Sequence, residues 1–139
     1  MIVVVIIGLL AALASQSYIK VQEESKVSTA ANDLRIFSEA FERYALEIGQ
    51  WPVDGTPNSI PAGMSGFFAD VTWQAGTAIG GVYDWDQGVF GITASVSITG
   101  YTASRNTLLK LDAKIDDGDL TTGRLREHFA GRLFFILEE

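Results

Sequence analysis

The segment from Asp112 to Gly123 concentrates the residues of this chain that could bind a metal ion. Its sequence, DAKIDDGDLTTG, places Asp112, Asp116, Asp117 and Asp119 around a glycine. Calcium takes about six to eight oxygen ligands at about 2.3–2.6 Å, and the carboxylates and carbonyls of a turn supply such oxygens. Crowded anions repel one another unless water or a cation offsets their charge. The four aspartates are therefore the candidate calcium ligands.

An ordinary solvated turn explains the same residues. Aspartate and glycine are favoured in turns whether or not an ion binds. The spacing of the aspartates also differs from that of an EF-hand loop. Both interpretations, a calcium site and a plain turn, stay open from the residues alone.

Enzymatic sites are poorly supported. His128 is the only histidine, and no serine stands near it in the sequence to act as a nucleophile. Asp84 and Asp86 flank Trp85, which suggests a glycosidase carboxylate pair, but a solvated sheet edge explains them equally well. Gly80-Gly81 precedes an expected strand rather than a helix, so it matches a nucleotide-binding loop weakly. We predict no catalytic site and no enzymatic activity.

The composition narrows the remaining function classes. The chain has 139 residues, of which 47% are hydrophobic and 19% charged, enough to bury the core of one modest domain. It has no cysteine, which excludes disulfides, thiol catalysis and cysteine-ligated zinc. The net charge of −7 argues against nucleic-acid binding through bulk electrostatics, so no nucleic-acid partner is expected.

The N-terminal segment is the most distinctive part of the chain. The residues from Met1 to Ala14, MIVVVIIGLLAALA, are apolar or glycine, and the first ionisable side chain is Lys20. As a helix, the uncharged stretch to Ile19 approaches the length that spans the ~30 Å hydrocarbon core of a bilayer. A secretory signal peptide fits poorly, because no basic residue precedes Ile2 and the cleavage match is weak.

This apolar run, followed by a soluble helix, resembles the N-terminal region of type IV pilins and of the pseudopilins of type II secretion. In that family an N-methylated Phe and a Thr-Leu-x-Glu-Leu segment lead into such a run. If Met1 matches the family's usual Met, we expect a short leading segment, with the family's glutamate, to precede it. The family's proline after the run is replaced here by Ser15-Gln16-Ser17.

The resemblance implies a structural subunit of a type IV pilus-like filament. Such a subunit is held in the bacterial inner membrane, extracted by an assembly ATPase and a platform protein, and polymerised through its N-terminal helix into a homo-oligomer. The product is a cell-surface pilus or a periplasmic pseudopilus. The apolar surface exchanges lipid for neighbouring helices and stays buried throughout, and small residues permit close helix approach. The expected filament-core residues are Ile2, Val5, Ile6, Gly8, Leu9, Leu10 and Leu13.

Two alternatives remain beside a pilus subunit. The first is the major pseudopilin of a type II secretion system. The absence of cysteine, the small domain and the acidic segment favour it, because major pseudopilins bind calcium in a C-terminal loop that this segment resembles. The second alternative, of a different class, is a membrane-anchored module that binds calcium or another ligand. Apart from calcium, no cofactor is expected.

The rest of the chain must position these residues. Apolar side chains recur every three or four positions from Val27 to Ile48, and Gly49 ends the pattern. We therefore predict one long helix whose second half packs an apolar stripe on a domain. Core packing is the expected role of Phe37, Phe41 and Tyr44 in that stripe.

The remaining elements are shorter. Residues 49–66 are rich in proline and glycine without periodicity and are predicted to form a loop. Ser104 is predicted to cap a short helix that reaches Ile115. Residue types and alternation predict a hairpin turn at Asp86-Gln87-Gly88 and strands at Phe67–Ala75, Gly81–Asp86, Val89–Thr99 and Gly131–Leu137.

Together these elements predict an α+β fold, with a long N-terminal α-helix packed on a small antiparallel β-sheet, as in pilins. The apolar half of the helix is expected to protrude. The expected division is a membrane or filament-core half-helix at 1–25 and a globular domain at 26–139. The latter comprises the amphipathic half-helix 26–48, the loop 49–66, and the sheet with a short helix at 67–139.

Overall fold

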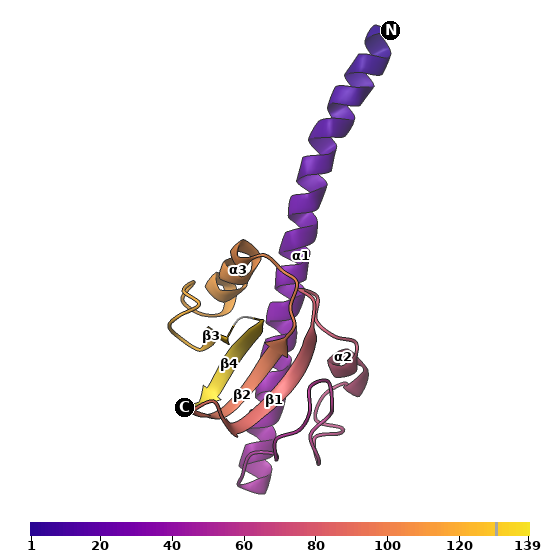
Figure 1. The fold of residues 1–139 in the computed structure, drawn as a ribbon. Coiled ribbons are helices and arrows are strands. Elements are labelled where there is room, and N and C mark those ends of the chain that lie inside the picture. Colours follow the sequence, from indigo (N-terminus) through magenta and orange to yellow (C-terminus); the bar gives the residue numbers. More distant parts are fainter. Residues whose placement is uncertain (130) are drawn as a thin grey trace.

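A computed structural model of the chain describes residues 1–129 and 131–139. It has the predicted α+β architecture, in which a long helix passes behind a small antiparallel sheet and its N-terminal half projects away from it (Figure 1). The elements in chain order are α1 (Ile2–Ile48), α2 (Asp70–Gln74), β1 (Val82–Val89), β2 (Ile92–Thr99), α3 (Arg105–Ile115), β3 (Leu125–Phe129) and β4 (Arg132–Glu138).

Helix α1 runs without interruption for 47 residues and ends at the predicted glycine. Gly49 adopts the left-handed conformation, with φ of 82°, and its N–H donates to the Ala45 carbonyl at 2.8 Å. A residue with a Cβ is disfavoured in that conformation, which explains the glycine. The buried residues of α1 lie in its second half and are Val27, Ala30, Ala31, Leu34, Phe37, Ser38, Ala40 and Phe41.

The first half of α1 has a different environment. Every residue from Met1 to Gln22 is exposed. Among the described residues, α1 is the one helix long and apolar enough to cross a membrane, with a mean hydropathy of 2.3 over its most apolar window and none of that window buried. By length and composition this segment is compatible with membrane association.

The core forms where the second half of α1 meets the sheet. Phe41 stacks on Trp85 with ring centroids 3.9 Å apart, and Phe37 packs edge-on against Trp73 at 4.9 Å and against Tyr83 at 4.8 Å. These rings are almost completely buried. Such aromatic pairs add about 0.5–1.5 kcal/mol each beyond the area they bury. Core packing of Phe37 and Phe41 is therefore confirmed, whereas Tyr44 is only partly buried.

The strands are ordered β1-β2-β4-β3, and each neighbouring pair is antiparallel. Strand β1 forms one edge, where the Asn58 N–H of the preceding loop donates to the Tyr83 carbonyl at 2.8 Å. The other edge is β3, a short strand that carries Arg126, Glu127 and His128. Charged residues are typical of edge strands.

The predicted hairpin turn at Asp86-Gln87-Gly88 is wrong, because these residues lie inside β1. The turn is Phe90-Gly91, with φ of 56° and 79°, a two-residue connection of the kind that suits a twisted hairpin. A phenylalanine with positive φ carries no sequence signal for a turn, whereas glycine after a polar residue does. The prediction followed the glycine after a polar residue at Gln87-Gly88, which does not mark the turn in this chain.

Two further expectations about the elements fail. The strand predicted at Phe67–Ala75 is wrong, because Asp70–Gln74 within it form helix α2. The buried Trp73 of α2 donates from its indole N–H to the Ser59 carbonyl at 2.9 Å. The aromatic residues of this segment pack in the core and do not belong to a paired strand. Strand β3 was not predicted, since its charged residues lack a strand pattern.

Helix α3 and its cap are confirmed: the Ser104 side chain accepts from the Thr107 N–H at 3.2 Å.

Candidate functional site

The acidic residues are positioned by the end of α3 and the turn behind it. Asp112 lies in the last turn of α3, and Asp116 follows the helix as its C-cap. Gly118 has a φ of 84°, which lets the chain reverse, and the Asp119 N–H then donates to the Asp117 carboxylate at 2.9 Å. This reversal brings side chains from the helix and from the turn to the same place.

Asp112, Asp116 and Asp117 form an acidic group that could hold a metal ion. One carboxylate oxygen from each residue lies within 4.8 Å of the other two. Asp112 is completely buried, and neither of its oxygens makes a hydrogen bond of ordinary geometry with a described residue. A buried charge without a partner is costly. A cation bound in this group would supply the positively charged partner that the Asp112 carboxylate lacks.

The electrostatics of Asp112 agree with its geometry. Burial raises its pKa from 3.8 to about 6, and the negative charges of Asp117, Asp116 and Asp119 add to the increase. The backbone amide of Gly118 offsets this effect only in part. At neutral pH the Asp112 carboxylate is therefore ionised in an environment that disfavours its charge, which is the condition a bound cation would relieve.

Asp116 joins the acidic group to the sheet. Its Oδ2 accepts hydrogen bonds from the backbone N–H groups of Leu125, at 2.9 Å, and Arg124, at the start of β3. A Cβ atom at Gly123 would overlap this carboxylate, so glycine is required for the close approach. A displacement of Asp116 would therefore also disturb these hydrogen bonds at the start of the edge strand.

Asp119, the fourth predicted ligand, is not brought into this group. Its carboxylate accepts from the Thr121 N–H at 3.0 Å and from the Thr121 hydroxyl at 2.7 Å. Asp117 likewise accepts from the Thr122 hydroxyl at 2.7 Å. These hydrogen bonds lower the pKa of both exposed aspartates. Asp119 orders the turn, and its charge adds to the field at Asp112.

The donor set fits a hard cation. Three carboxylates without nitrogen or sulfur ligands favour calcium or magnesium over transition metals. The mixture of a helix residue and turn residues suits the irregular coordination of calcium better than the strict octahedron of magnesium. Backbone carbonyls of the turn and water would complete the shell.

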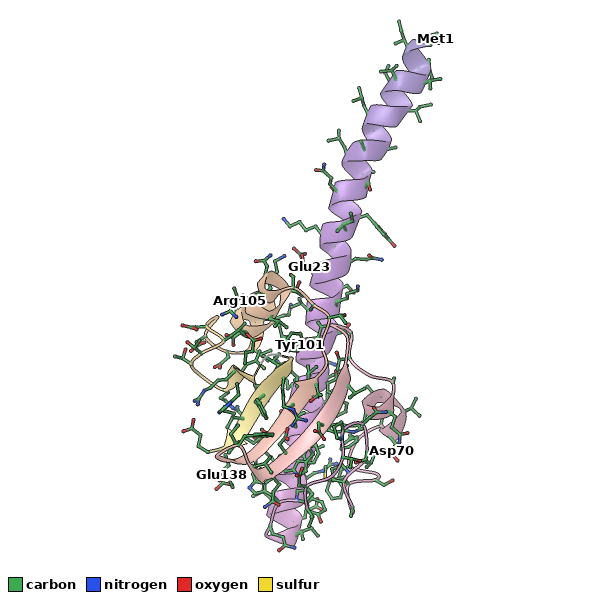
Figure 2. All side chains as sticks on the ribbon, in the orientation of Figure 1. Met1, Glu23, Asp70, Tyr101, Arg105 and Glu138 are labelled. Atoms are coloured by element: carbon green, nitrogen blue, oxygen red, sulfur yellow. The ribbon has the colours of Figure 1, made fainter. Side chains whose placement is uncertain are left out.

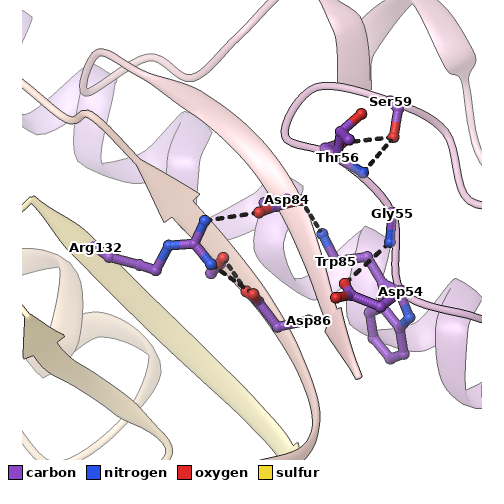
Figure 3. A network of polar contacts seen from close by, with 9 residues as sticks. Asp54, Gly55, Thr56, Ser59, Asp84, Trp85, Asp86 and Arg132 are labelled. Atoms are coloured by element: carbon purple, nitrogen blue, oxygen red, sulfur yellow. Dashed lines mark hydrogen bonds and ion pairs between the residues drawn. The ribbon is translucent and has the colours of Figure 1, made fainter. Parts of the chain in front are cut away.

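A second polar cluster lies on the face of the sheet opposite the aromatic core. Arg132 of β4 reaches across β2 to β1 and lies between two carboxylates, with Nη2 2.8 Å from Asp84 and Nη1 2.5 Å from Asp86 (Figure 3). The Ser97 hydroxyl donates to Asp86, and the guanidinium lies 5.4 Å from the Phe90 ring centroid. The solvated-edge interpretation of the two aspartates is wrong, because each is 3% exposed.

Both carboxylates are committed to Arg132, so this cluster joins three strands rather than presenting an acid pair to a substrate. Sequence analysis singled out the two aspartates but not their partner Arg132. Arg132 is 46 residues or more from Asp84 and Asp86 in the chain, and only the antiparallel register of β2 with β1 and β4 brings it to them.

One guanidinium cannot fully compensate two buried carboxylates, which predicts a pH dependence. Burial and the neighbouring Asp86 raise the pKa of Asp84 from 3.8 to about 6. Between these values the folded chain keeps a proton that the unfolded chain releases, so this contribution to stability is lost as pH rises from about 4 to 6. In chemical denaturation, the unfolding free energy of wild type relative to Asp84→Asn should fall by about 1–3 kcal/mol over that window. A difference that grows with pH would mean that Arg132 lowers the pKa instead.

Comparison of the chain with protein-family models, with curated proteins and with solved structures found no match.

Proposed function

We propose that this chain is a structural subunit of a type IV pilus-like filament, held in the inner membrane by α1 and polymerised through it. The observation that carries the proposal is the first half of α1, which is apolar and without a partner in its own chain. Of the predicted filament-core residues, Ile2 is 77% exposed, Leu9 63%, Leu10 61% and Leu13 67%. Burying one such side chain yields about 1.5–3 kcal/mol, so a stripe of them strongly favours a covered state.

The apolar half is hydrophobic on all sides, which separates it from the amphipathic half. A helix of this kind belongs in a membrane or in the interior of a bundle. Exposed apolar patches much smaller than this one already mark interaction sites. A filament subunit uses both environments in turn, first lipid and then the helices of its neighbours. A simple tether would use only the first.

The joint between α1 and the globular part is fixed. Glu23 of α1 accepts from the Thr107 hydroxyl at 2.6 Å and from the Lys110 ammonium at 2.7 Å, both of α3. Helix α1 also continues unbroken into the aromatic core, so the protruding half and the domain share one helix. In the proposed filament, helix packing in the centre would then set the position of every domain on the outside.

The acidic group favours a second candidate, the major pseudopilin of a type II secretion system. Its supporting observation is the completely buried, unpaired Asp112 within reach of Asp116 and Asp117. A membrane-anchored module that binds calcium or another ligand is supported by the same observation. It leaves the predicted filament-core residues of α1 without a role in assembly. In either filament the partners would be copies of this chain, an assembly ATPase and a platform protein.

Electron microscopy distinguishes these candidates. Cells expressing the full chain with its assembly machinery are sheared, and the released material is labelled with an antibody against the globular domain. Labelled filaments support the pilus subunit. If labelled filaments appear only when the chain is overproduced with a secretion system, the pseudopilin is favoured. Membrane-bound chain without filaments in either case would contradict a filament function.

Calcium is expected to stabilise the chain through the acidic group. At a concentration of 100 times its dissociation constant, the ion would add about 2.7 kcal/mol, which raises the melting temperature by about 5–10 °C. The full chain in detergent is melted with calcium and with a chelator. Asp117→Ala should melt alike in both, whereas Asp54→Asn, on an exposed loop, should respond as wild type does.

Equal melting temperatures of wild type with calcium and with chelator would identify the acidic group as an ordinary solvated turn. The proposed filament function would be unaffected by that result, because it depends on the other end of the chain.

A further inference from the structure

The four lysines of this acidic chain gather at one end of the globular part. Lys20 and Lys26 lie on α1, and Lys110 and Lys114 on α3. The two helices touch there: the Lys110 ammonium is 2.7 Å from Glu23, and the Lys114 ammonium donates to Ser28 at 3.0 Å. From Gln50 to Ser104 the sequence has no lysine or arginine. The lysines are thus concentrated where α1 leaves the globular part, the region of Glu23 and Arg105 in Figure 2.

This region also has the marks of a membrane surface. Tyr18 and Ile19 are 65% and 64% exposed and are followed by Lys20, the first charge of the chain. Tyrosine is enriched at the membrane–water boundary, and lysine extends its ammonium towards the polar layer. The boundary assigned by these residues does not depend on how the chain begins. It places Lys20 at the edge of the hydrocarbon layer.

Helix geometry then gives the depth of the residues that follow. Along α1, Glu23 lies ~4.5 Å and Lys26 ~9 Å beyond Lys20. The headgroup layer extends ~5–8 Å outward from the hydrocarbon on each side. Glu23 is therefore within that layer, and the ammonium of Lys26, on a long flexible side chain, reaches back into it.

A groove of about 450 Å³ opens at this depth, between α1 and the segment that leads into α3. On one side it is lined by Ile19, Gln22 and Lys26, and on the other by Thr102 and Ser104. The groove thus offers an apolar side chain towards the hydrocarbon, and an amide, two hydroxyls and an ammonium towards the water. This order of chemical groups, from apolar to polar and cationic, matches the glycerol and phosphate of a phospholipid.

The charges at the groove favour an anion. Glu23 also lines it, but its carboxylate is bound by Lys110 and Thr107. Lys26 is exposed and makes no ion pair with any residue in the described part of the chain. Glu24 lines a separate groove between α1 and α3, with Lys110 and Lys114. Among the described residues of the first groove, Lys26 is consequently the charged side chain without an ion-pair partner. Lys20 lies closer to the N-terminus on the same helix.

We propose that this groove binds the headgroup of an anionic phospholipid, with the phosphate at Lys26, while the chain is in the membrane. The inference rests on the membrane stage of the proposed function. Each lysine near an anionic surface strengthens association by about fivefold. A bound headgroup would hold the globular part at a fixed height and rotation against the bilayer until the subunit is extracted.

The test is a comparison of two spin-labelled lipids around the full chain in phosphatidylcholine vesicles. Electron paramagnetic resonance measures how strongly labelled phosphatidylglycerol and labelled phosphatidylcholine associate with the protein. We expect a preference for phosphatidylglycerol of about fivefold or more, and its loss at ~1 M salt, where charges are screened within ~3 Å. Lys26→Gln should bring the preference close to one, and Lys26→Arg should retain it.

Lys114→Gln is the matched control, since it removes a lysine of the same end that lines the other groove. It should leave most of the preference. Equal losses in Lys26→Gln and Lys114→Gln, or equal association of both lipids with wild type, would overturn the assignment of the groove. Loss of the preference in excess inorganic phosphate, compared with chloride of equal ionic strength, would identify a site for free anions and also overturn it.

Failure of this inference and failure of the proposed function give different results. Normal insertion with no lipid preference contradicts only the headgroup site. A chain that stays out of the vesicles contradicts the membrane stage and the headgroup site together. If Lys26→Gln keeps the lipid preference but assembles no filaments, the lysine serves a neighbouring subunit, and the lipid assignment is wrong.

Discussion

Replacing Leu10 with aspartate is expected to abolish filament formation. Leu10 lies near the middle of the uncharged stretch and is 61% exposed in the single chain, so a filament of the proposed kind would bury it between helices. A carboxylate at that position would be buried without a partner, which costs several kcal/mol in every subunit contact. Electron microscopy of sheared material from cells expressing Leu10→Asp should show no filaments. Normal filaments from this variant would contradict polymerisation through α1.

The same substitution also opposes membrane insertion, and the two effects must be separated. An aspartate at the centre of a membrane helix costs about 2.5–3.5 kcal/mol on insertion scales, which the remaining apolar residues offset in part. Carbonate extraction of membranes therefore accompanies the microscopy. Inserted chain without filaments assigns the defect to assembly. Leu10→Ile, which keeps the apolar surface, should insert and assemble like wild type.

Removing Arg132 is expected to cause a large loss of stability. Arg132→Met keeps much of the side-chain volume but leaves Asp84 and Asp86 buried without their cation. Breaking a buried ion pair on one side costs about 3–5 kcal/mol, which lowers the melting temperature by about 10 °C or more at this chain length. Thermal denaturation of the full chain in detergent measures the change.

Two companion variants test the cause. Arg132→Met combined with Asp84→Asn and Asp86→Asn removes the stranded charges and should regain most of the lost stability. Arg105→Met breaks an ion pair with Glu127 whose arginine side chain is 63% exposed, and should cost less than about 1 kcal/mol. Wild-type stability of Arg132→Met would show that the cluster contributes little.

Local signals predicted the two long helices, α1 and α3. The three- and four-residue spacing of apolar residues, the terminal glycine and the serine cap are properties of neighbouring residues, and α1 and α3 follow them. The features that sequence analysis missed depend on distant partners. Helix α2 exists because Trp73 completes an aromatic core, and β3 pairs because β4 lies beside it.

The candidate metal site shows the same limit. The sequence placed the four aspartates in one segment but did not distinguish their environments. Asp112 is completely buried, because it lies on the inner side of α3, whereas Asp119 is exposed and bonded within its own turn. Burial depends on how α3 packs against α1 and the sheet, which no spacing of acidic residues encodes.

The two edges of the sheet have a consequence for how copies of this chain meet. A bare edge strand is a template for strand addition, which leads to aggregation. Here the loop residue Asn58 already occupies the Tyr83 carbonyl of β1, and β3 carries Arg126, Glu127 and His128 in a short strand. Strand addition is thus disfavoured on both sides of the sheet. In the proposed filament, self-association would thereby be left to α1.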